Sequence, residues 1–343
     1  MRKLLNVLYV TSSDAYIALD GENVVIRKDD REALRMPLLN LEGIVTFGYT
    51  GASPALMGAC AKRNISLCFM TANGRFLARS VGEVRGNVLL RKQQYRVSDD
   101  EIQSLLVAKN MISGKLYNSR WVIERAIRDH GMRLDADKLK RASDFIKNSI
   151  SAVNSCGSLD ELRGIEGEGA ARYFGVFNDL ILQQQADFVF NGRNRRPPLD
   201  RINALLSFVY TLLANETASA LETVGLDPYV GFLHRDRPGR ISLALDVMEE
   251  FRPVMADRFV ISLINKREVN KKGFTVQENG AVIMDSQTRK TVLNAWQERK
   301  RETITHPFLS EKLPWGLVPY VQAMLLARHL RGDLDAYPTF LWK

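Results

Sequence analysis

Short apolar runs separated by turn residues fill the first 85 residues, a pattern typical of β-strands. The dipeptides Asp20-Gly21 and Asn73-Gly74 are favoured in the tight turns of β-hairpins. Pro54, directly after Ser53, favours the first turn of one short helix. The runs that we assign to strands cover residues 15–19, 24–27, 44–46, 65–70 and 76–79. We therefore expect a small β-rich domain over residues 1–85.

Beyond residue 85 the apolar residues recur three and four positions apart over long segments, which is typical of amphipathic helices. One helix is predicted to begin at the capping pattern Ser98 to Glu101, and another at Ser158, reaching about Gln184. Two more are predicted over residues 137–153 and after Asp200. The sequence thus predicts an α+β chain in which the β-rich domain is followed by a larger, all-α domain over residues 86–343.

The segment from Leu226 to Pro253 joins one histidine, His234, to a helix whose polar residues are nearly all acidic. Apolar residues between Ile241 and Phe251 cover most of the helix circumference, so this helix is expected to be largely buried. Its polar residues are spaced three and four apart and are predicted to form one stripe: Ser242, Asp246, Glu249 and Glu250. Buried carboxylates repel one another, and they need a cation or hydrogen-bond donors. A metal ion would meet that need.

A second candidate position lies in a helical pattern that contains Gly164, Gly167 and Gly169 around Glu166. Each glycine inside a helix costs about 1 kcal/mol relative to alanine, so three of them suggest close approach of a backbone or a ligand. Glu166 and His234, with Glu249 or Asp246, would give two oxygens and one nitrogen, a donor set suited to Mn²⁺ or Mg²⁺. A structural histidine and a solvated glutamate are the alternative, and spacing alone does not choose between them.

Composition favours a polyanionic partner. The chain has 48 Lys and Arg against 39 Asp and Glu, a formal net charge of +9 and a pI near 9.4. The three cysteines are scattered and are interpreted as reduced and structural. We find neither a signal-peptide pattern nor an apolar run of 18 residues, so a soluble, cytoplasmic protein with no membrane contact is expected.

Arginines concentrate in two places that could contact DNA phosphates. One is a proline-containing loop and the start of the following helix, and the other flanks the acidic segment. The candidates are Arg193, Arg195, Arg196, Arg201, Arg235, Arg237, Arg240 and Arg252. Solvated loops, or pairing with the nearby acids, are the alternatives. A basic helix around Trp296 is interpreted as a solvated surface.

Three of these segments closely resemble CRISPR-associated protein one, the catalytic subunit of the CRISPR adaptation integrase. They are GIEGEGAARYF (residues 164–174), RRPPLDRINALLSFVYTLL (195–213) and GLDPYVGFLHRDRPGRISLALDVMEEFRP (225–253). The resemblance extends over the whole chain, to YVQAMLLARHLRG at residues 320–332, and is strongest to the branch accompanying subtype I-C systems.

The resemblance implies a β-rich dimerisation domain and a helical catalytic domain that binds Mn²⁺ or Mg²⁺. It places the metal ligands at Glu166, His234 and Glu249, where many relatives have aspartate at the last position. Asp246 matches a further acidic position of the family, as a supporting residue or alternative ligand. These four residues are the expected catalytic set.

The activity implied is that of a metal-dependent DNA endonuclease and integrase. It would insert short foreign fragments, called spacers, into a CRISPR repeat array when a 3′-hydroxyl attacks a phosphodiester. Double-stranded DNA, a second copy of the chain in a homodimer, and CRISPR-associated protein two are the implied partners. A general metal-dependent nuclease on branched DNA or RNA, and a non-catalytic DNA-binding scaffold, are the alternatives.

Overall fold

The structure, a computed structural model, describes residues 6–12, 14–29, 31–82 and 87–342. The chain divides into two compact units. The first unit comprises residues 1–85 and 284–301, and the second comprises residues 86–283 and 302–343. The segment 284–301, which the sequence assigned to the helical domain, is therefore part of the β-rich unit.

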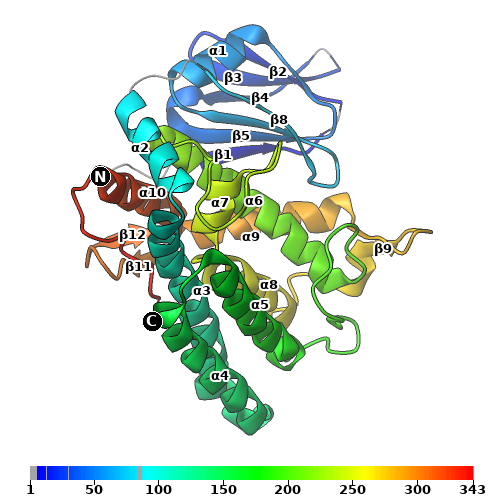
Figure 1. Ribbon diagram of the computed structural model, residues 1–343. Helices are drawn as coiled ribbons and strands as arrows, with labels where there is room; N and C mark the ends of the chain where they lie inside the picture. Colours follow the sequence, from blue (N-terminus) through cyan, green and yellow to red (C-terminus); the bar gives the residue numbers. More distant parts are fainter. Residues whose placement is uncertain (1–5, 13, 30, 83–86, 343) are drawn as a thin grey trace. The chain divides into compact units, whose positions relative to one another are not determined.

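Two four-stranded sheets form the first unit (Figure 1). In one, the order is β1-β5-β7-β8, with parallel β1–β5 and β5–β7 pairs and an antiparallel β7–β8 pair. In the other, the order is β4-β3-β2-β6, with antiparallel β4–β3 and β3–β2 pairs and a parallel β2–β6 pair. The strands are β1 Asn6–Val10, β2 Tyr16–Asp20, β3 Asn23–Lys28, β4 Arg31–Pro37, β5 Leu41–Phe47, β6 Gly51–Ala52, β7 Ser66–Met70 and β8 Phe76–Ser80.

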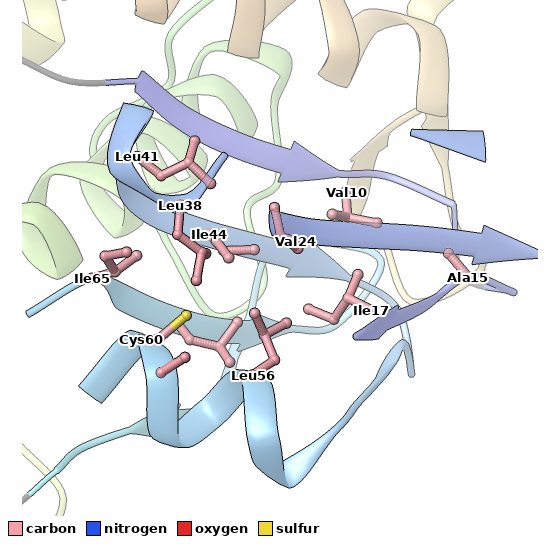
Figure 2. Packing of buried hydrophobic residues seen from close by; sticks show 12 residues of the cluster. Val10, Ala15, Ile17, Val24, Leu38, Leu41, Ile44, Leu56, Cys60 and Ile65 are labelled. Carbon is pink, nitrogen blue, oxygen red and sulfur yellow. The ribbon is translucent and has the colours of Figure 1, made fainter. Parts of the chain in front are cut away.

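Helix α1 (Pro54–Lys62) covers the core of this unit and begins as predicted, because the Ser53 hydroxyl accepts a hydrogen bond from the Leu56 amide. Figure 2 shows Leu56 and Cys60 of α1 pointing toward apolar side chains of the strands, among them Ile17 and Ile44. The short apolar runs that the sequence assigns to strands supply much of this cluster.

Helix α9 (Ser286–Arg301) corrects the interpretation of a solvated basic face. Trp296 is fully buried, and the Lys300 ammonium lies 3.1 Å from the Glu42 carboxylate of β5. A lysine stem can cover apolar surface while its charge is paired, so a basic sequence need not be solvated.

The second unit is mainly helical (Figure 1). Helices α3, α4 and α5 pack side by side, and α6 packs against α7 and α10. The helices of this unit are α2 Val88–Asp99, α3 Glu101–His130, α4 Ala136–Ser155, α5 Leu159–Gly175, α6 Arg201–Val224, α7 Ser242–Met248, α8 Arg258–Asn265 and α10 Val318–Leu330. Short 3₁₀ turns and one π-helical segment join them: η2 Gly131–Arg133, η3 Phe177–Leu180, η4 Arg252–Asp257, η5 Lys271–Gly273 and η6 Trp315–Leu317, besides η1 Leu38–Asn40 in the first unit.

The predicted α+β class is confirmed, with corrections in detail. Two small sheets, β9 (Phe274–Val276) with β10 (Val282–Met284) and β11 (Thr303–Thr305) with β12 (Lys312–Pro314), mean that the C-terminal part is not all-α. Helix α5 ends at Gly175 rather than near Gln184.

The start of α3 also differs from the prediction. Asp100, and not Ser98, caps it by accepting from the amides of Ile102 and Gln103. Ser98 lies in the preceding helix and donates to the carbonyl of Gly231 at 2.8 Å.

Helix α6 is long and apolar, contrary to the expectation that no such run exists. An 18-residue window has a mean hydropathy of 1.2, enough by length and composition to cross a membrane. Within the second unit 61% of that window is buried, as in the core helix of a globular protein. Asp200 caps its start through the Asn203 amide, and Gly225, with φ +90°, ends it.

Candidate active site

Helix α5 carries Glu166 and starts at a reciprocal cap. The Ser158 hydroxyl accepts from the Glu161 amide at 3.2 Å, while the Glu161 carboxylate accepts from the Gly157 amide at 2.7 Å. Residues 158–161 therefore fix the start of the helix that presents Glu166.

The glycines of α5 have different surroundings. A Cβ at Gly169 would lie 2.5 Å from Cδ2 of Leu116, so this glycine permits the close approach of α5 to α3. A Cβ at Gly164 or Gly167 would meet no atom within 4 Å. The sequence suggested close approach of a backbone or a ligand at these glycines; the structure shows a close neighbour at Gly169 alone of the three, and that neighbour is a side chain.

Lys115, the residue before Leu116 on α3, is the centre of the site. Its side chain is buried, and its ammonium is hydrogen-bonded to Oε1 of Glu166. The same ammonium lies 2.7 Å from Oε2 of Glu249. The two carboxylates therefore meet at one buried positive charge, although three separate parts of the chain supply the groups.

Glu249 lies at the C-terminal end of α7 and is paired on both sides. The guanidinium of Arg252, one helical turn further, lies 2.9 Å from Oε1 of Glu249, while the Lys115 ammonium contacts Oε2. Burial alone would raise the pKa of Glu249, but the charges of Arg252 and Lys115 outweigh it and hold the pKa well below its usual range. Glu249 is thus an ionised carboxylate inside the protein.

His234 is oriented by Asp246 of α7. Nδ1 of the imidazole lies 2.5 Å from Oδ1 of Asp246, and the His234 amide donates to the same oxygen at 3.0 Å. The other oxygen, Oδ2, accepts from the amides of Phe232 and Leu233 at 2.7 and 2.9 Å. Asp246 is fully buried, and these four contacts use both of its oxygens. With Nδ1 held in this way, Nε2 is the ring nitrogen left to face a ligand.

The loop that carries His234 is fastened to its surroundings. Arg163 of α5 donates twice to the carbonyl of Leu233, at 3.1 and 2.7 Å. On the other side, a Cβ at Gly231 would lie 2.7 Å from Oδ2 of Asp246, so only glycine leaves room for this carboxylate. The histidine is therefore positioned by contacts on both sides.

Glu250 does not join this site, which corrects the prediction of one acidic stripe. Its carboxylate accepts from the Phe340 amide at 2.6 Å, the Tyr337 hydroxyl at 2.5 Å and the Gln322 amide at 3.2 Å. Because α7 ends at Met248, the acids beyond it leave the regular helical spacing on which the stripe depended. Glu250 instead binds the C-terminal segment.

Three of the arginine candidates are engaged within the protein. Arg193 donates to Oδ1 of Asn203 at 2.7 Å, and Arg201 donates to a backbone carbonyl at 2.6 Å. Arg252 is paired as described above. Their guanidinium groups have internal partners, which is the alternative that the sequence left open for such arginines.

The other five candidates lie on two loops. Arg195, Arg196, Arg235 and Arg237 are exposed, and Arg240 is half-buried. Partial burial and the charge of Arg237, with a smaller effect of Arg195, lower the pKa of Arg240. The charge of Arg195 on one loop therefore acts on Arg240 on the other. Arg235 is partly balanced by Asp160 at 3.0 Å.

The described residues contain no group of three His, Cys, Asp or Glu side chains that could hold a metal ion as they stand. The chemistry of the predicted ligands nevertheless fits one. Glu166 and Glu249 already share a cation, the Lys115 ammonium, and His234 interacts electrostatically with Glu249. Two carboxylates and an imidazole are donors that Mn²⁺ and Mg²⁺ accept.

The sequence interpretation missed Lys115 and Arg163. Lys115 stands three residues after Ile112 and one before Leu116, two residues of the apolar stripe of α3. A lysine within such a stripe needs a buried partner, and that signal could have identified it. Arg163 has no comparable signal, because its partner is a backbone carbonyl 70 residues away.

Comparisons with known proteins agree with one another. The family model described as CRISPR associated protein Cas1 matches residues 8–298. A CRISPR-associated endonuclease Cas1 from Chlorobaculum tepidum is 48% identical over 343 residues, covering 100% of both chains. Another, from Rhodospirillum rubrum, is 52% identical over 347 residues and also covers 100% of both.

Solved structures share the fold. A casposase bound to integration product has a TM-score of 0.84 at 23% identity, covering 99% of this chain and 95% of that one. A Cas1 protein from Thermotoga maritima has a TM-score of 0.81 at 21% identity, covering 96% and 97%. A Cas6-RT-Cas1–Cas2 complex has a TM-score of 0.82 at 21% identity, covering 100% of this chain and 36% of that one.

Proposed function

This chain belongs to the Cas1 family of CRISPR-associated proteins, and we propose that it is a DNA endonuclease and integrase that inserts short foreign DNA fragments into a CRISPR repeat array. The observation that carries the proposal is the convergence of Glu166 and Glu249 on one buried point, beside a histidine whose ring is held by Asp246. The endonuclease names of the relatives support the same chemistry.

Glu166, His234 and Glu249 are the proposed ligands of a divalent ion, Mn²⁺ or Mg²⁺. Asp246 is proposed to orient His234 without binding the ion, because both of its oxygens already accept hydrogen bonds. When bound, the ion would stabilise negative charge on the phosphoryl oxygens of the reacting phosphodiester.

In this reaction the protein positions the reacting groups and does not supply a covalent nucleophile. The 3′-hydroxyl of the incoming fragment forms a new P–O bond while a P–O bond of the repeat breaks. The cysteines are unsuited to a nucleophilic role, since burial raises the pKa of Cys60 to about 11 and that of Cys68 to about 12. Cys156 is buried as well.

DNA is proposed to contact the cationic surface formed by the two arginine loops, which contains Arg195, Arg196, Arg235, Arg237 and Arg240. Exposed guanidinium groups can bind phosphates in bidentate fashion. The net charge of +9 supports a polyanionic partner.

The proposed assembly is a homodimer that works with CRISPR-associated protein two on double-stranded DNA in the cytoplasm. The Cas1–Cas2 complex among the similar folds supports the second partner. Assignment to the subtype I-C branch is also a proposal, because the family and relative names do not distinguish subtypes.

The test is strand transfer into a repeat-containing plasmid with Mn²⁺. Glu166→Ala, His234→Ala and Glu249→Ala are each expected to abolish product while circular dichroism remains that of a folded protein. Glu168→Ala, an exposed glutamate on the same helix, is the matched control and should keep full activity. Full activity in any of the first three variants would refute the assignment.

The same assay separates the alternatives. Cleavage of branched DNA or RNA without insertion into the repeat would identify a general nuclease. Function that persists in EDTA would identify a DNA-binding scaffold. We expect insertion to need both the repeat and the metal.

A further inference from the structure

Lys115 occupies the position at which the two proposed carboxylate ligands meet. Lys115 is 5% exposed and Glu249 is 3% exposed, so these two charges interact with little water between them, while the Glu166 side chain is 25% exposed. The ammonium contacts Glu166 on α5 and Glu249 at the end of α7. A buried ammonium of this kind is stable only because both carboxylates pair with it.

The charges around this point already balance. Lys115 and Arg252 are positive, and Glu166 and Glu249 are negative. A divalent ion would add two positive charges to a cluster that sums to zero. Like charges a few ångströms apart in a poorly hydrated site repel strongly, so the ion and the ammonium compete for the same oxygens.

The two partners of Glu249 are not equivalent in this competition. Arg252 holds Oε1, while Lys115 holds Oε2 and also contacts Glu166. If the ammonium withdraws, Glu249 keeps its orientation through Arg252, and one oxygen of each carboxylate is released. Lys115 is therefore the group whose departure opens the site.

We infer that Lys115 is an internal cation that holds Glu166 and Glu249 together in the metal-free protein and that must be displaced when a divalent ion binds. It is a positioning residue that stabilises the empty site and weakens metal affinity. The inference rests on the proposed function, because it takes Glu166 and Glu249 as metal ligands.

The test measures Mn²⁺ binding to the full-length, metal-stripped protein by isothermal titration calorimetry, with no DNA present. Lys115→Met keeps the length and removes the charge, and it is expected to bind Mn²⁺ roughly tenfold more tightly or better, because no ammonium has to leave. Its thermal midpoint without metal is expected to fall, and the rise on adding Mn²⁺ is expected to exceed that of the unmodified protein.

Lys109→Met is the matched control. It removes the same charge from the same helix, but Lys109 donates to the carbonyl of Asn154 and not to a carboxylate. Its Mn²⁺ affinity should equal that of the unmodified protein. If Lys115→Met does not fold, Lys115→Gln, which keeps a hydrogen-bond donor without the charge, replaces it and should also bind more tightly.

The outcomes distinguish the two proposals. Unchanged or weaker Mn²⁺ binding in folded Lys115 variants, with normal binding by the unmodified protein, overturns the role of Lys115 and leaves the proposed function intact. No Mn²⁺ binding by any variant overturns both. Tighter binding by the Lys115 variants alone supports both.

Discussion

Replacing Glu250 by glutamine measures how much the ionisation of this buried side chain destabilises the folded protein. Glu250 is fully buried, and burial raises its pKa to about 8 from 4.5, although hydrogen bonds from Phe340, Tyr337 and Gln322 partly oppose this. The folded protein therefore keeps a proton that the unfolded chain releases at lower pH. Stability from this group is complete below about pH 4.5 and is lost progressively as the pH rises to about 8.

The magnitude follows from the size of the shift. Each pKa unit corresponds to about 1.4 kcal/mol, so ionising Glu250 costs the folded state about 3–5 kcal/mol at pH 8 or above. A glutamine side chain at this position cannot ionise, and its amide oxygen can still accept from the Phe340 amide. Glu250→Gln is thus expected to match the unmodified protein near pH 4.5 and to exceed its stability by that amount near pH 8.

The assay is thermal unfolding in EDTA at a series of pH values. The difference between the two midpoints is expected to grow with pH to roughly 10 °C, and contributions from other groups, such as Asp257, cancel in it. Glu278→Gln makes the same change on an exposed side chain and should show no such trend. A midpoint difference that stays constant from acid to alkaline pH would refute the reasoning.

Three further predictions concern the site's supports. Asp246→Asn leaves amide protons facing the backbone donors and frees the His234 ring, so strand transfer is expected to fall about 10–100-fold, with lower thermal stability. Gly231→Ala places a methyl group against the Asp246 carboxylate and is expected to lower the free energy of unfolding, measured in urea, by about 1–3 kcal/mol. An unchanged urea midpoint would show that the loop can move to accommodate the methyl group. On α5, Gly167→Ala is expected to raise the free energy of unfolding by up to about 1 kcal/mol, and with it the thermal midpoint. Gly169→Ala is expected to lower both, because its methyl group would meet Leu116. A shift of the midpoint in the same direction for both variants would contradict the packing argument.

Element type and several boundaries follow from local sequence, because the groups that fix them are close in the chain. Ser53, Ser158 and Asp200 each cap a helix through an amide three residues away, at the helix starts that the sequence predicts. The prediction that failed, at Ser98, did so because tertiary contact intervened: its hydroxyl and the neighbouring Gln94 bind the loop at residues 227–231. Local patterns cannot reveal such partners.

The Leu226–Pro253 segment contains its own histidine and aspartate, and their pairing spans 12 residues. The sequence could therefore indicate a half-site there. It could not assign the three acids, because Asp246, Glu249 and Glu250 are distinguished by partners from the loop before α7, from α3 and from the C-terminal segment.

Only the tertiary structure put a lysine at the centre of the site. The sequence by itself showed the net positive charge, the acidic residues near His234 and the glycines of α5, and the family resemblance identified Glu166 as a ligand candidate. The contact between Glu166 and Lys115 spans 51 residues and depends on two helices crossing closely where Gly169 meets Leu116. Ionic contacts of this kind are decided by which surfaces pack together, since the side chains alone would pair equally well with water or with nearer charges.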